Sequence, residues 1–127
     1  MKLLSSKTHT IIGLVVGVAL LLAPWLFGFN DVESAALVAR LVGLFIIINE
    51  LITTSDASPL KLVPMGTHIV IDCLTGAFLA LSPWLFGFAT LSANVWVPHV
   101  IVGLLVIGYA LATNPSKDSH GSTAVYS

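Results

Sequence analysis

The chain contains one heptapeptide twice, and this repeat constrains the fold more than any other feature. The first copy, APWLFGF, spans residues 23–29, and the second, SPWLFGF, spans residues 82–88. The similarity continues on both sides: Thr8-His9 aligns with Thr67-His68, Val42-Gly43-Leu44 with Val102-Gly103-Leu104, and Thr53 with Thr113. Self-similarity over such a length predicts a duplicated structural unit. We place the two units at about residues 8–54 and 65–113.

The composition places these units in a membrane. Hydrophobic residues make up 57% of the chain and charged residues 9%, whereas soluble domains carry about 25% charged residues. No charged side chain occurs between Lys7 and Asp31, or between Asp72 and Lys117. Apolar stretches of about 18 or more residues are typical of membrane-spanning helices. A net charge of −1 without a basic cluster argues against a nucleic-acid partner, so the lipid bilayer is the expected environment.

Four helices are predicted, at about residues 8–29, 35–54, 65–88 and 94–113. Pro24 and Pro83 should bend or end the first and third helices, since proline has no backbone donor. Gly28 and Gly87 should allow the left-handed conformation that terminates a helix. The expected fold class is therefore all-α: a four-helix transmembrane bundle made of two tandem, parallel-repeat hairpins. The remaining segments are an N-terminus (residues 1–7), a proline-containing linker (55–64) and a polar, disordered tail (114–127).

Lysines predict the orientation of the bundle. Cationic residues in short loops favour the cytoplasmic side of a membrane. The lysines outside the expected helices fall at the termini and in the linker, namely Lys2, Lys7, Lys61 and Lys117. We therefore expect both termini and the linker to be cytoplasmic, and both heptapeptides to lie at the outer face.

Paired Pro-Trp motifs, each ending one helix of a two-helix unit, resemble the SPW repeat family of small prokaryotic membrane proteins. Ser82-Pro83-Trp84 matches the Ser-Pro-Trp motif, whereas the first copy has Ala23 in place of serine. The resemblance spans roughly residues 8–114. It implies a four-helix architecture and a place in the prokaryotic inner membrane. It implies no reaction, substrate or catalytic residue.

Small residues and aromatic residues predict how the helices pack. Glycines at helical spacing let membrane helices approach closely. We expect the glycine faces of the first and third helices to meet near the pseudo-twofold axis or to line an interface between protomers. The aromatic residues of both heptapeptides, including Trp25 and Trp84, are expected in a belt at the outer boundary, or else in a cleft for a lipid, a quinone or a partner helix. The expected packing glycines are Gly13, Gly17, Gly43, Gly76 and Gly103.

Ionisable residues inside the helices are the candidates for a polar site. Arg40, Glu50 and Asp72 would each cost about 2.5–3.5 kcal/mol at mid-helix, so they are functional candidates by default. One hypothesis is a polar track from Glu50 through Asp72 and His68 to Arg40, which would relay protons or accept a small ion. The alternative is a buried Arg40–Asp72 pair, within or between protomers, with Glu50 near the water interface.

The remaining patterns argue against metal binding and catalysis. No two of the histidines have metal-ligand spacing, the only cysteine is Cys73, and no nucleophile or phosphate-loop motif occurs. We therefore expect no metal, no cofactor and no catalysis. The leading hypothesis is a scaffold or accessory subunit that forms a homo-oligomer or joins a larger membrane complex. The alternatives are a conduit for protons, ions or small solutes, and a binding module for an apolar ligand.

Overall fold

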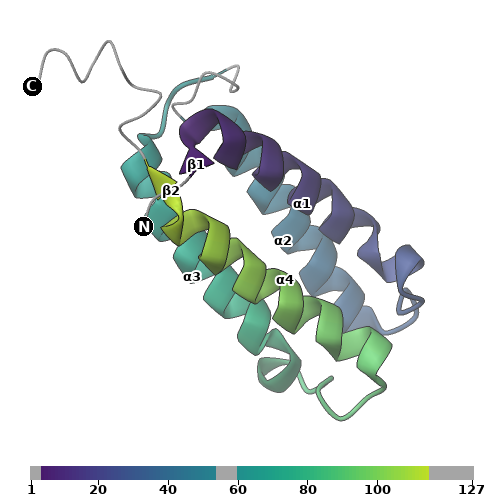
Figure 1. Ribbon diagram of the computed structural model, residues 1–127. Coiled ribbons are helices and arrows are strands. Elements are labelled where there is room, and N and C mark those ends of the chain that lie inside the picture. Colours follow the sequence, from purple (N-terminus) through teal and green to yellow (C-terminus); the bar gives the residue numbers. More distant parts are fainter. Residues whose placement is uncertain (1–3, 54–59, 115–127) are drawn as a thin grey trace, which may run out of the picture.

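The computed structural model describes residues 4–53 and 60–114, which form four long helices and two very short strands (Figure 1). Much of the expected linker and nearly all of the expected tail lie outside the described residues. The elements are β1 (Leu4–Ser5), α1 (Ser6–Leu26), α2 (Glu33–Ile52), α3 (Met65–Leu85), α4 (Ala93–Leu111) and β2 (Thr113–Asn114). All four helices are long and apolar enough to cross a membrane.

The helices are arranged as two hairpins. Helix α1 packs closely along α2, and α3 along α4, whereas contacts between the hairpins are fewer. Figure 1 shows β1 and β2 together at one end of the bundle and the α1–α2 and α3–α4 turns at the opposite end. We call these the strand end and the turn end. The predicted bundle of two tandem, parallel hairpins is confirmed.

At the strand end, two pairings between short extended segments join the hairpins, and both have the same arrangement. β1 pairs with β2 in parallel, with Leu4 opposite Thr113, and an isolated bridge joins Val63 to Thr53. Leu4 and Val63 precede the first helix of their hairpins, and Thr53 and Thr113 follow the second. Each pairing therefore connects the start of one hairpin to the end of the other, and the two threonines occupy equivalent places.

At the turn end, each heptapeptide terminates its helix in the same way. Gly28 has φ +73° and Gly87 has φ +77°, so both adopt the left-handed conformation that an L side chain disfavours. The Phe29 amide donates to Pro24 O and the Phe88 amide to Pro83 O, each at 2.8 Å. These are the six-to-one hydrogen bonds of a Schellman motif. Both glycines thus adopt the helix-ending conformation, and α1 and α3 end at Leu26 and Leu85, three residues before the predicted ends at residues 29 and 88.

The serine of the second heptapeptide compensates for its proline. Pro83 has no amide hydrogen, so it cannot donate to the carbonyl of Leu79, four residues earlier. Ser82 Oγ donates to Leu79 O at 2.6 Å, in a place that is fully buried. In the first copy Ala23 occupies the equivalent position and has no hydroxyl to offer. The serine hydroxyl therefore replaces the hydrogen bond that proline cannot donate within the buried helix.

The aromatic residues of the heptapeptides divide into two sets. Trp25 and Trp84 are 58% and 60% exposed, as expected for a belt at the membrane boundary. Phe29 and Phe88, which we expected in the same belt, are instead buried. Their rings lie 5.3 and 4.6 Å from that of His99, which is also buried. The Schellman turn directs the last residue of each motif inward, so the two heptapeptides meet around His99.

The glycines pack the helices within each hairpin. A methyl group added at Gly17 would lie 2.6 Å from Ile47 Cγ1 of α2, and one at Gly76 would lie 2.6 Å from Gly103 O of α4. Gly17 and Gly43 face each other, as do Gly76 and Gly103. We expected the glycine faces of α1 and α3 to meet each other or another protomer. That expectation was wrong for these glycines, because they are covered inside their own hairpins.

Exchanging serine and alanine between the two motifs tests the role of the hydroxyl. We expect Ser82→Ala to lower the free energy of unfolding by about 1 kcal/mol, because Leu79 O loses its donor. Ala23→Ser should raise the stability or leave it unchanged, because it offers a donor to Leu20 O. Thermal unfolding of the purified protein in detergent measures both. Equal stability of Ser82→Ala and the wild type would contradict this account.

Candidate functional site

Four ionisable side chains converge inside the bundle near the strand end. They are His9 from α1, Glu50 from α2, and His68 and Asp72 from α3. None of the four is more than 1% exposed. We call this group the polar cluster. Each hairpin supplies one histidine and one carboxylate, so the cluster joins the two hairpins.

The contacts within the polar cluster are short. His9 Nε2 lies 2.7 Å from Asp72 Oδ2, and His68 Nε2 lies 3.0 Å from the same oxygen. Glu50 Oε1 lies 2.9 Å from His68 Nε2 and 3.5 Å from His9 Nε2. The His9 ring also packs edge-on against the rings of His68 and Tyr109, at 5.0 and 4.9 Å between centroids. Two nitrogen atoms and two oxygen atoms are thus directed at one point.

Two threonines determine which histidine nitrogens face the carboxylates. Thr53 Oγ1 donates its only hydrogen to Asn49 O at 2.5 Å, so its contact with His68 Nδ1 at 2.5 Å must be donated by the ring. Thr113 Oγ1 likewise donates to Tyr109 O at 2.6 Å and accepts from His9 Nδ1 at 2.7 Å. Both Nδ1 atoms therefore carry hydrogen. In a neutral ring, each Nε2 then presents a lone pair to the cluster.

The cluster follows the internal repeat in its histidines and departs from it in its acids. His9 and His68 are repeat equivalents, and each bonds to the threonine that ends the other hairpin. At the position equivalent to Asp72 the first repeat has Gly13, and at the position equivalent to Glu50 the second has Ala110. A side chain at Gly13 would collide with the Glu50 carboxylate. Each hairpin thus places an acid on one helix and a small residue on the other.

The negative charges of the cluster must be neutralised inside the bundle. Two carboxylates carry two negative charges, and bare charge in an apolar interior is strongly unfavourable. With neutral imidazoles, lone pairs of nitrogen and oxygen would face one another at about hydrogen-bond distance unless protons or a cation lie between them. The four side chains are the described residues that could hold a metal, and Cys73 is not among them.

The structure brings together three of the four residues expected in the polar site. Glu50, His68 and Asp72 meet, and Glu50 is wholly buried rather than close to water. Arg40 lies elsewhere, at the turn end, where it bonds to Asn30 Oδ1 and stacks 4.3 Å above the ring of Trp25. The expected Arg40–Asp72 pair therefore does not form within a chain.

An apolar core separates Arg40 from the polar cluster. Its buried members come from all four helices: Val16, Leu20, Val38, Val42, Ile46, Leu79, Val106 and Tyr109. Only Tyr109 among them is polar, and its ring packs against His9 at the cluster. Among the described residues, the expected track to Arg40 is thus interrupted. The physical reason is helix length, because Arg40 and Glu50 stand about 15 Å apart along α2.

Sequence reasoning missed His9 and the two threonines. Their signal was present, since His9 aligns with His68, and Thr53 with Thr113, across the repeat. Duplicated polar residues at the ends of apolar helices indicate a symmetric contact between repeats. The pairing itself could not be read from spacing, because His9 and Thr113 are separated by nearly the whole chain.

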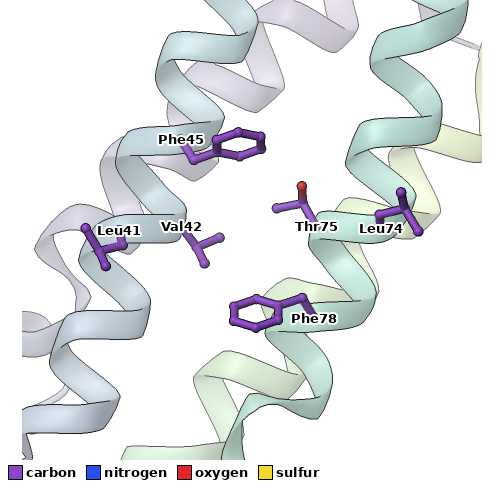
Figure 2. A pocket seen from close by; sticks show the side chains of 6 residues that line it. All are labelled: Leu41, Val42, Phe45, Leu74, Thr75 and Phe78. Atoms are coloured by element: carbon purple, nitrogen blue, oxygen red, sulfur yellow. The ribbon is translucent and has the colours of Figure 1, made fainter. Parts of the chain in front are cut away.

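A groove opens between the hairpins on the side of α2 and α3. Figure 2 shows side chains of both helices facing one another across it, and its volume is about 450 Å³. A second hollow of about 240 Å³ shares three of its lining residues and reaches Phe86 of the second heptapeptide. The only hydroxyl lining the first, that of Thr75, donates to Ile71 O of its own helix at 2.8 Å. The groove is lined by Leu41, Val42, Phe45, Leu74, Thr75 and Phe78.

Removing one threonine hydroxyl tests the geometry of the polar cluster. We expect Thr113→Val to lower the free energy of unfolding by about 1–3 kcal/mol, because His9 Nδ1–H is left buried without an acceptor. Thr75→Val is the matched control, since that hydroxyl bonds only within its own helix. Chemical or thermal unfolding in detergent gives the comparison. Equal effects of the two substitutions would show that the hydrogen bond to His9 does not matter.

Comparison with known proteins identifies the family. No curated protein and no solved structure matches the chain. The SPW repeat domain matches residues 7–113, which cover both hairpins, both heptapeptides and all four residues of the polar cluster. With four apolar helices of membrane-spanning length, this match makes the chain an integral membrane protein. The chain belongs to the SPW repeat family.

Proposed function

We propose that this protein is a structural membrane subunit, a scaffold or accessory component that receives a transmembrane helix of another subunit in the groove between α2 and α3. The observation that carries the proposal is the groove itself, which a single chain leaves open although its hairpins are joined at both ends. The polar cluster joins them at the strand end. At the turn end, Asn94 Nδ2 donates to Phe27 O at 2.7 Å.

The shape of the groove favours a helix as its occupant. On α2 the lining positions include Ser34, Val38, Leu41 and Phe45, which recur every three or four residues over about three turns. Such a row forms a ridge and an adjoining channel, into which the side-chain ridge of another helix can pack. Large side chains line the groove, so contact would be made by interdigitation rather than by close backbone approach.

The glycine faces do not provide the docking surface. Gly17 and Gly43 are covered by each other, as are Gly76 and Gly103. A partner therefore meets leucine, valine and phenylalanine side chains. This directs the proposed interaction away from the faces of α1 and α3 that the sequence favoured, and toward α2 and α3.

The proposal needs no conduction and no catalysis. The apolar core between the polar cluster and Arg40 disfavours a conduit through a single chain. Lys7 and Lys61, both exposed, lie toward the strand end, which supports a cytoplasmic strand end and an outer turn end. Family membership supports a place in a prokaryotic inner membrane. The partner is either a second copy, giving a homo-oligomer, or a different subunit.

Filling the groove tests the proposal. Leu41→Trp places a larger side chain in the groove, whereas Leu44→Trp places the same side chain on another exposed face of α2. We expect native mass spectrometry of the gently released wild type to give a complex of fixed stoichiometry. Leu41→Trp should reduce it to the single chain because the partner helix no longer fits, and Leu44→Trp should leave it intact.

A photoreactive phenylalanine analogue at position 78 supplies an independent measurement. In native membranes it should cross-link one protein of reproducible mass, the same as in the intact complex, and the same probe at Leu104 of α4 should not. Adducts with lipid alone at position 78, together with a monomeric wild type, would overturn the proposal. That result would assign the groove to lipid acyl chains, the apolar ligand considered from the sequence.

A further inference from the structure

We propose that the polar cluster is a binding site for a divalent transition-metal ion of the zinc class, held by His9 Nε2, His68 Nε2, one Glu50 oxygen and one Asp72 oxygen. The inference does not depend on the docking role of the groove. It starts from the donor set, since neutral imidazole and carboxylate are the nitrogen and oxygen ligands that zinc takes in proteins. The four donor atoms lie within 4.8 Å of one another.

The distances suit a four-coordinate ion. Metal–ligand bonds of about 2.0–2.1 Å in a tetrahedron place neighbouring donor atoms about 3.3 Å apart. In the cluster the four nitrogen–oxygen contacts are 2.7, 2.9, 3.0 and 3.5 Å. These four contacts lie within about 0.6 Å of the tetrahedral separation. All four donor atoms lie within 4.8 Å of one another, so side-chain torsions can adjust the site around an ion.

The threonines orient both histidines as a metal site requires. Metal-binding histidines usually donate their second ring N–H to an oxygen acceptor, which sets the tautomer and makes the other nitrogen the ligand. Here Thr53 and Thr113 accept from Nδ1 of His68 and His9, while their own hydrogens bond to helix carbonyls. The Nε2 lone pairs are thereby directed at the carboxylates. In the neutral ring, this second layer of hydrogen bonds leaves Nε2 as the nitrogen that can bind a metal ion.

Charge favours a divalent ion. Two neutral imidazoles and two carboxylates carry a total charge of −2, and one divalent cation neutralises it within an apolar bundle. Calcium and magnesium prefer six or more oxygen ligands, or retain several waters, which a site with two nitrogen ligands and no exposed surface does not suit. The hydroxyl of Tyr109, whose ring packs on His9, is buried and has no hydrogen-bond partner among the described residues.

The ion would connect the two hairpins. His9 and Glu50 belong to the first hairpin, and His68 and Asp72 belong to the second. Gly13 is a positioning residue for this site, because a side chain there would displace the Glu50 carboxylate from its present place. A single site shared by the two repeats explains why the first repeat has glycine at the position where the second has Asp72.

The test uses the full-length protein, purified without a polyhistidine tag and treated with a chelator. His120→Gln, outside the described residues, removes a tail histidine that would bind zinc adventitiously. We expect zinc to bind saturably, with one ion per chain by elemental analysis. His68→Gln and Asp72→Asn should weaken binding more than tenfold, and Thr113→Val by about 10–100-fold. Glu33→Gln, which changes an exposed carboxylate at the turn end, should bind as the parent does.

A second measurement uses the protein with an intact polar cluster, so its result does not depend on whether the substituted variants fold. X-ray absorption of the zinc-loaded protein should show two nitrogen and two oxygen neighbours at about 2.0–2.2 Å. Cobalt in the same site should show the visible absorption of a four-coordinate ion. Absence of saturable binding, a coordination shell without histidine, or equal binding by folded Asp72→Asn would overturn the proposal. None of these results bears on complex formation through the groove.

Discussion

The architecture depends on the neutralisation of buried charge. A chain that crosses a bilayer four times has little water with which to solvate a carboxylate, so each acid inside must meet a partner. Glu50 and Asp72 meet His9 and His68, and the histidines in turn meet Thr113 and Thr53. These contacts cross from one hairpin to the other at the strand end. The same group of side chains is therefore both a polar link between the hairpins and the group of described residues that could hold a metal ion.

Duplication explains how such a centre arises with few changes. Two equal hairpins bring equivalent histidines and threonines to the pseudo-axis, where each pair crosses to the other repeat. Acids at both equivalent positions of each repeat would bring four carboxylates together. Instead, each hairpin has one acid and one small residue at these positions: Glu50 and Gly13 in the first, Asp72 and Ala110 in the second. At the turn end, the equivalent residues Phe29 and Phe88 remain paired around His99. The two repeats therefore stay equivalent in the aromatic packing at the turn end and differ in the acids of the polar cluster.

The sequence predicted the two hairpins well, because membrane-spanning length and the repeat follow from local or periodic constraints. Apolar length indicates a span, Gly28 and Gly87 indicate helix ends, and Asp72 within an uncharged run indicates a buried polar site. The contact partners of these residues were harder to predict. Arg40 was placed near Asp72 by charge alone, yet it bonds to Asn30 beside Trp25. The glycine faces were assigned to contacts between repeats or protomers, although Gly17 is covered by Gly43 and Gly76 by Gly103 within the same hairpin.

By itself, the sequence determined that the chain is a duplicated, four-helix membrane protein with ionisable groups inside its spans. Periodicity, composition and the repeated heptapeptide carry that information, since they depend on residues close together in the chain. Only the tertiary structure decided that His9, Glu50, His68 and Asp72 share one site and that α2 and α3 leave a groove. The physical reason is that both features arise between hairpins. There the angle and register of packing, which no local pattern encodes, determine which side chains meet.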